Sequence, residues 1–278
     1  MLTGLNQIGI SIKQLTPHAN TKLQRYQLLK ERFTELIAGL GCNEEKSIEF
    51  NNVENWRNRF LGQGVLPPST AASIECETLE KRWQNLQSTL LNLGPLSKQM
   101  SPFNDGYEEI LWAGDFVIVV EIGKLKSRGV MRGWVNHLIV CASDKTPSKT
   151  LVIARSSSKS KKDLFEIPIK WGPLTKRQAA QELNKLRCLA MQGVKYCWPV
   201  PPESGWAFIK ASHTDPLKGE MAFKRSWNGS FNNLGERDAP EMKLCFGTNF
   251  EVENFLTNKT FKEACSLLYK PIIEFLSN

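Results

Sequence analysis

Glu109, Glu121 and Lys124 carry the side chains that metal-dependent nucleases use, two carboxylates and an amine. In such a site the carboxylates hold Mg²⁺ and the lysine stands beside them. This chemistry needs an acidic-x-Lys pair, because residues i and i+2 of a strand share a face whereas residues i and i+3 do not. Glu121 and Lys124 have the second spacing. The sequence therefore predicts a degenerate site with no catalysis and no metal, and an active Mg²⁺-dependent nuclease is the alternative.

Basic side chains cluster after two of the predicted strands. If these strands are parallel neighbours, their carboxyl ends meet at one edge of the sheet. Lysine and arginine at such an edge bind phosphates without reading bases. We predict DNA contacts from Lys124, Lys126, Arg128, Arg132, Arg155, Lys159, Lys161 and Lys162. The alternative for each of them is a solvated face that keeps the domain soluble.

The elements that position these residues lie between positions 107 and 155. Residues 107–113 and 116–122 are rich in apolar and β-branched side chains, and Gly114-Asp115 between them predicts a tight hairpin. Apolar residues then recur with the period of a helix as far as Ala142, and residues 151–155 predict another strand. A strand, a helix and a strand in this order form a right-handed crossover between parallel neighbours. We therefore expect an α/β fold with a mixed sheet flanked by helices.

The remainder of the chain is predominantly helical in pattern. Amphipathic spacing predicts helices over residues 23–40, 53–61, 69–91, 175–191 and 259–276. Residues 206–210 predict a short strand, and the polar, basic residues 156–162 predict a solvated loop. A break rich in glycine and proline suggests a helical N-terminal segment, 1–68, and a nuclease-like α/β domain with a degenerate active site, 69–278.

Composition excludes several other classes of protein. The net charge of +8 fits a polyanionic partner such as DNA. No P-loop motif for ATP hydrolysis is present, and three histidines without metal-ligand spacing make a histidine-based zinc site unfavourable. Seven scattered cysteines predict reduced, buried thiols. With no leader and no apolar run of membrane length, we expect a cytoplasmic protein without membrane contact.

Single aromatic residues offer weaker signals. His137 is expected at the polar margin of its helix, in a structural or exposed position. Tryptophan side chains stack on bases in single-strand paths, but Trp134 lies on an apolar helix face and is expected in the core. Trp198 and Trp206 flank a proline-rich loop. They are therefore the more open candidates for a DNA or subunit contact.

Short motifs, in order and spacing, resemble the C-terminal part of RecC, the gamma subunit of exodeoxyribonuclease V. The motifs are WRNRF at 56–60, VLP at 65–67, RGWVNHLIVCAS at 132–143, PESGWAFIK at 202–210, Trp227, GERD at 235–238 and LLYKPIIEF at 267–275. The resemblance runs from about Trp56 to the end of the chain. It implies a restriction-endonuclease-like (PD-(D/E)xK-type) fold with a degenerate site, matching the order of helix, hairpin, crossover helix and strand.

The resemblance also implies partners. RecB-type and RecD-type subunits would join this chain in a helicase-nuclease complex that acts on duplex or forked DNA in double-strand break processing and recombinational repair. Mg and ATP would be used by those subunits, with no cofactor bound by this chain. A full RecC subunit is several times longer, so we expect a fragment or the product of a split or decayed gene, and we do not transfer Chi recognition. A free-standing DNA-binding module is the third alternative.

Overall fold

The computed structural model describes residues 22–40, 53–66, 70–103, 106–143, 147, 149–158, 160–196, 198–230 and 233–277. They fall into two compact units. Unit 1 comprises Met1–Lys98, Ile122–Lys124 and Ala154–Glu166, and unit 2 comprises Gln99–Glu121, Leu125–Ile153 and Ile167–Asn278. The boundary that we place between residues 68 and 69 stays a prediction.

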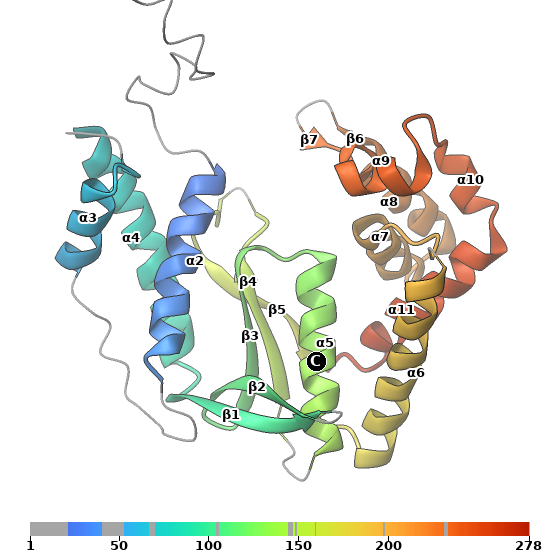
Figure 1. The fold of residues 1–278 in the computed structure, drawn as a ribbon, viewed down its shortest axis with the longest axis horizontal. Helices are drawn as coiled ribbons and strands as arrows, with labels where there is room; N and C mark the ends of the chain where they lie inside the picture. The colour runs from blue at the N-terminus through green and yellow to red at the C-terminus, as the bar shows by residue number, and fades with distance from the viewer. Residues whose placement is uncertain are drawn as a thin grey trace, which may run out of the picture. The chain divides into compact units, whose positions relative to one another are not determined.

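Helices dominate the chain, and five strands form its main sheet (Figure 1). The helices are α2 (Lys22–Ala38), α3 (Val53–Gly62), α4 (Thr70–Leu91), α5 (Ser127–Ala142), α6 (Lys176–Lys195), α7 (Pro202–Ser212), α8 (Pro216–Asn228), η2 (Glu236–Asp238), α9 (Pro240–Phe246), α10 (Val252–Leu256) and α11 (Lys259–Glu274). The strands are β1 (Leu96–Phe103), β2 (Gly106–Ala113), β3 (Phe116–Lys124), β4 (Lys149–Arg155) and β5 (Phe165–Trp171), with a small pair of β6 (Gly229–Ser230) and β7 (Asn233–Leu234). Within these described helices, none is long and apolar enough to cross a bilayer.

The sheet has the strand order β1-β2-β3-β4-β5. The predicted hairpin is confirmed: β2 and β3 are antiparallel, and Gly114 at the turn has the positive φ of 54° that glycine adopts without strain. At the other end of β3, Lys124 Nζ donates a hydrogen bond of 3.4 Å to the carbonyl oxygen of Ser157, just after β4. The carboxyl ends of β3 and β4 therefore lie together, as expected of parallel neighbours joined by α5.

Helix α5 packs closely on the sheet within unit 2. A Cβ atom at Gly133 would lie 2.7 Å from Val152 Cγ2 and 3.1 Å from the Trp171 ring, so only glycine allows this approach. Trp134, on the same helix, is buried in a core that also includes residues of α7, α8, α10 and α11. The prediction that Trp134 belongs to the core is confirmed.

Residues near the end of the chain extend the sheet at β5. The Ser277 amide donates a hydrogen bond of 2.9 Å to the carbonyl oxygen of Lys170, and Leu276 forms an antiparallel bridge with Trp171. Trp171 Nε1 in turn donates a hydrogen bond of 2.9 Å to the carbonyl oxygen of Ile272 in α11. The end of α11 is thus fixed to the edge strand by backbone and side-chain bonds.

In unit 1, one buried cation joins three helices. The Arg32 guanidinium of α2 lies over the rings of Trp56 in α3 and Trp83 in α4, 5.0 Å and 4.3 Å from their centroids. Its Nη1 also pairs with the Glu80 carboxylate at 2.9 Å. Cation–π contact and ion pairing together offset the cost of removing the charge from water.

Three expectations need correction. Residues 206–210 are helical, in α7, because Pro202 supplies the fixed φ suited to the first turn of a helix. His137 is fully buried rather than at a polar margin, because Thr150 provides a partner for its ring. Of the five described cysteines, all free, Cys188 and Cys245 are exposed, so burial is less general than expected.

We expect His137 to make the protein less stable in acid. Burial lowers the pKa of its imidazole to about 4, whereas the unfolded chain titrates near 6.5. Between these values the unfolded state binds more protons, so the free energy of unfolding should fall by up to about 3 kcal/mol as the pH drops through this window. Urea denaturation across the pH range measures the loss. A His137→Gln variant should lack this contribution, and an unchanged pH dependence in that variant would contradict the assignment.

Candidate nucleic-acid interface

The carboxylate of Glu121 on β3 is engaged by an arginine. Arg132 Nη2 on α5 lies 2.8 Å from Glu121 Oε1 and also donates a hydrogen bond of 3.0 Å to the carbonyl oxygen of Val120. A Cβ atom at Gly129 would lie 2.7 Å from the Glu121 side chain, so the start of α5 covers this carboxylate closely. In this arrangement Glu121 serves as an anchor for Arg132.

The hairpin register separates the two candidate acids. Trp112 lies opposite Val117. Continued along both strands, this register places Glu109 opposite Val120, and opposed residues of an antiparallel pair share a face. Glu121 follows Val120 directly, so its side chain projects from the other face. The geometry does not bring Glu109 and Glu121 together.

The lysine of an acidic-x-Lys pair is also missing from its position. Gly123 occupies the i+2 position from Glu121, and Lys124 is exposed at the end of β3. In the described parts of the chain, no three His, Cys, Asp or Glu side chains gather as a potential metal site. What remains at the end of β3 is an exposed cation beside Ser157.

Four residues with predicted DNA contacts lie in the described part of unit 1. Lys124, Lys161 and Lys162 are exposed, and Lys159 lies outside the described residues. Arg155 is half-buried, and its Nε has no hydrogen-bond partner among the described residues. Burial lowers the pKa of Arg155, and the nearby charge of Arg82 lowers it further. The exposed lysines are therefore better placed for phosphate than Arg155.

The loop that carries these lysines is anchored to α4. Arg82 Nε donates to the Asp163 carboxylate at 2.7 Å, and Asn85 Nδ2 donates to the Asp163 carbonyl oxygen at 3.0 Å. The loop is closed by a hydrogen bond of 2.9 Å from the Ser156 amide to the Leu164 carbonyl oxygen. Fixing the base of the loop reduces the entropy lost when Lys161 binds a phosphate.

Unit 2 contributes the other three contacts, all exposed and near the start of α5: Lys126, Arg128 and Arg132. The Lys126 side chain does not cap this helix. Instead, the Glu203 carboxylate of α7 accepts hydrogen bonds from the Ser127 amide at 3.1 Å and the Ser127 hydroxyl at 2.9 Å. A carboxylate is favourable there because it satisfies an unpaired amide and interacts with the helix dipole.

A second carboxylate caps α7 in the same way. Glu236 of η2 accepts hydrogen bonds from the amides of Glu203 and Ser204, at 2.8 Å and 2.7 Å. Burial raises the pKa of Glu236, while these amide donors act in the opposite direction. Both glutamates border a cavity of about 490 Å³, together with Lys126 and Arg128. The two caps therefore fix the helix starts that surround this cavity.

Sequence reasoning did not identify these capping residues. Glu203 and Ser127 are far apart in the chain, and the capping motifs recognisable in a sequence are local. Glu236 belongs to the GERD motif, which had signalled only the family resemblance. The residues next to Glu236 in the sequence do not indicate that its side chain caps α7.

The tryptophans separate into two groups. Trp112, Trp134 and Trp171 are buried and closed to nucleic acid. Trp198 and Trp206 are half-buried, as their position beside the proline-rich loop suggested. Their contact with DNA or a subunit stays a prediction.

Comparison with known proteins gives one family. The family model of the RecC C-terminal domain matches residues 12–213. No curated protein matches the chain. The family match spans the whole five-stranded sheet and every predicted DNA contact.

We expect Glu236→Ala to lower the free energy of unfolding by about 1 to 2 kcal/mol, because the amides of Glu203 and Ser204 lose their acceptor. Glu236→Gln should also destabilise the protein, since it keeps one acceptor oxygen and turns an amino group towards the other amide donor. Urea denaturation at neutral pH measures both. Glu241→Ala, at an exposed glutamate bordering the same cavity, is the matched control. Equal losses in the Glu236→Ala and Glu241→Ala variants would contradict the capping role.

Proposed function

Because the chain belongs to the RecC C-terminal domain family, we propose that it works as a noncatalytic domain of a RecC-type subunit, holding the other subunits and contacting duplex DNA. The family match carries the first part of this proposal: it supports membership of a RecBCD-type complex, the exodeoxyribonuclease V of double-strand break processing and recombinational repair. We further propose that the chain holds RecB-type and RecD-type subunits, that it contacts duplex or forked DNA, and that it is located in the cytoplasm.

The hairpin and the helix after it support a domain without catalysis. The sequence α4, β1, β2, β3, α5, β4 follows the element order of restriction-endonuclease-like nucleases, which supports the PD-(D/E)xK-type assignment. At the position of the acidic-x-Lys pair, Glu121 is neutralised by Arg132, and glycine replaces the lysine. We propose a nuclease-like scaffold whose site has been lost, with Mg and ATP used by the partner subunits.

The exposed lysines and arginines support the proposed contact with DNA. Those of unit 1 follow β3 and β4, whose carboxyl ends lie together, and those of unit 2 begin α5. Such side chains bind the sugar-phosphate backbone, which positions a protein on DNA without selecting a sequence. This suits a subunit that must move along any linear duplex.

Replacing Lys159, Lys161 and Lys162 together with Glu should weaken binding to duplex DNA and flatten its salt dependence. Each lost phosphate contact lowers the slope of log K against log salt by about 0.9 for duplex DNA, so three contacts lower it by about 3. Fluorescence anisotropy with a labelled duplex at several salt concentrations measures affinity and slope together.

The matched control reverses the same amount of charge elsewhere, at exposed lysines of α8, α9 and α11: Lys218, Lys243 and Lys259. This variant tests the effect of net charge alone and should keep most of the slope. An unchanged slope in the loop variant, or an equal reduction in both variants, would remove the loop from the proposed interface.

Size-exclusion chromatography with the RecB-type subunit of the same organism tests the scaffold role. We expect the two chains to elute together, with or without forked duplex DNA. The free chain with Mg²⁺ should leave linear duplex DNA intact, because Glu121 is paired with Arg132. Separate elution would argue against a scaffold. DNA cleavage that is lost in a Glu121→Gln variant would instead establish the active-nuclease alternative.

A further inference from the structure

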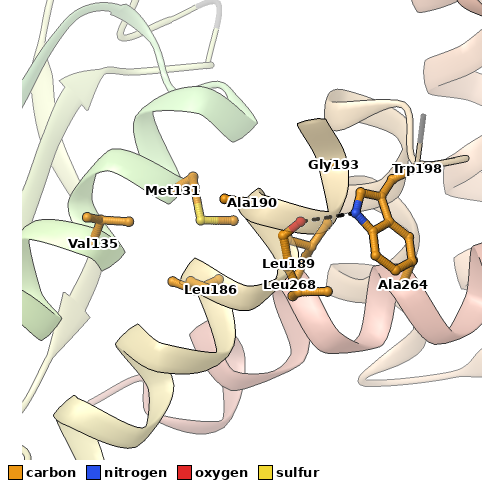
Figure 2. Close-up of a pocket in the computed structure, with 9 residues that line it drawn as sticks. All are labelled: Met131, Val135, Leu186, Leu189, Ala190, Gly193, Trp198, Ala264 and Leu268. Carbon is orange, nitrogen blue, oxygen red and sulfur yellow. Dashed lines mark hydrogen bonds between the residues drawn. The ribbon is translucent and has the colours of Figure 1, made fainter. Parts of the chain in front are cut away.

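Unit 2 has an apolar groove between three helices. It has a volume of about 330 Å³, and its walls come from α5, α6, α11 and the segment after α6 (Figure 2). The side chains that define it are Met131, Val135, Leu186, Ala190, Trp198 and Leu268. It shares no lining residue with the cavity beside Glu203.

The groove offers almost nothing for a polar ligand to bind. Trp198 Nε1 donates a hydrogen bond of 3.2 Å to the carbonyl oxygen of Leu189, drawn as the dashed line in Figure 2. The polar atom of the indole is thus used inside the protein, and the ring presents hydrocarbon. Gly193 allows this position, because a Cβ atom there would be 3.2 Å from Trp198 Cδ1. The walls therefore suit apolar side chains.

Helix α6 is largely uncovered along this groove. In its 20 residues only Ala179 is buried. Towards its end, Met191 is 63% exposed and Val194 is 89% exposed. Leu186 and Leu183 are only partly buried against the core. Clustered apolar exposure of this kind marks an interaction site, because burying it releases roughly 25 cal/mol per Å².

The charge of α6 indicates what kind of partner would cover it. The helix carries one acidic residue, Glu182, which pairs with Lys185 at 2.6 Å. Its basic residues are Lys176, Arg177, Lys185, Arg187 and Lys195. A second copy of the chain that docked through the same helix would present the same positive charge and be repelled. Duplex DNA would match the charge but has no apolar side chains for the groove.

We propose that this groove binds an amphipathic helix of a partner protein, with apolar residues spaced i, i+3, i+4 and i+7 in the groove. Its acidic residues would face Lys185 and Arg187, which lie on either side of the groove residue Leu186. Helices commonly bind in grooves in this way. The concave groove favours a protruding helix over a flat membrane surface. The proposed subunit role supplies a context for such a partner, but the groove and the charge of α6 stand independently of it.

The test uses a fluorescein-labelled synthetic helix with Leu at those four spacings and Glu at the flanking positions, titrated with the full chain. Fluorescence anisotropy should show binding that weakens at least about tenfold when Lys replaces Glu in the peptide, since opposite charges then become like charges. Ala190→Glu in the protein should weaken binding by a similar factor, because it places a charge in an apolar groove. Ala190 is exposed, so this variant should fold normally.

Two further variants make the result specific. Gln181→Glu adds the same charge on the opposite side of α6, since it lies nine positions from Ala190 and each residue turns the helix by about 100°; it should bind the peptide as the unchanged protein does. Arg187→Glu should lower the affinity of the protein for the acidic peptide and raise its affinity for the peptide that carries Lys in place of Glu.

Several outcomes would overturn the proposal. One is equal affinity for the two peptides, and another is full binding by the Ala190→Glu variant. A third is self-association of the chain, or binding to vesicles of anionic phospholipid, without binding of the peptide. If Ala190→Glu abolished that self-association or vesicle binding, the groove would have a different occupant. Co-elution with the RecB-type subunit does not depend on this peptide, so failure here is distinguishable from failure of the proposed function.

Discussion

The close approach of α5 to β4 and β5 is the constraint on which unit 2 depends. At Gly133 the helix backbone lies so near Val152 and Trp171 that no side chain fits between them. This contact allows α5 to be buried on the sheet side by β4 and β5 and on the other side by the C-terminal helices. The crossover helix is thus the shared wall of one continuous core, and a shift of α5 would disturb the sheet and the helices together.

The same packing determines how the helix starts are satisfied. Helix N-termini need acceptors, and those of α5 and α7 come from distant parts of the chain: Glu203 for α5 and Glu236 for α7. Each cap therefore acts as a tertiary contact between segments distant in the chain. Lys126 and Arg128 are exposed beside the capped N-terminus of α5. A rigid frame with cations on its outside is the arrangement that the proposed contact with the DNA backbone requires.

Local patterns predicted the elements that have strong local signals. The hairpin at Gly114 follows from turn chemistry and is confirmed. The helix expected from residue 175 is α6, and the Thr175 side chain caps it through a local capping box. β1 and β5 were not predicted, and each contains a proline, which is uncommon inside a strand. β1 also has no clear apolar alternation, whereas β5 does alternate, so its signal was present in the sequence. The register that separates Glu109 from Glu121, and the salt bridge from Arg132, depend on tertiary packing. The sequence could therefore indicate a defective acidic-x-Lys pair but could not identify the partner of its carboxylate.

The bridge between Leu276 and Trp171 affects how the sheet meets other molecules. β5 is the last strand in the sheet order, and an uncovered edge strand presents amide and carbonyl groups that pair readily with strands of other chains. The bond from Ser277 to Lys170 occupies part of that edge, and Pro168 within β5 removes another amide donor. The residues after α11 thereby protect part of the β5 edge against pairing with strands of other chains.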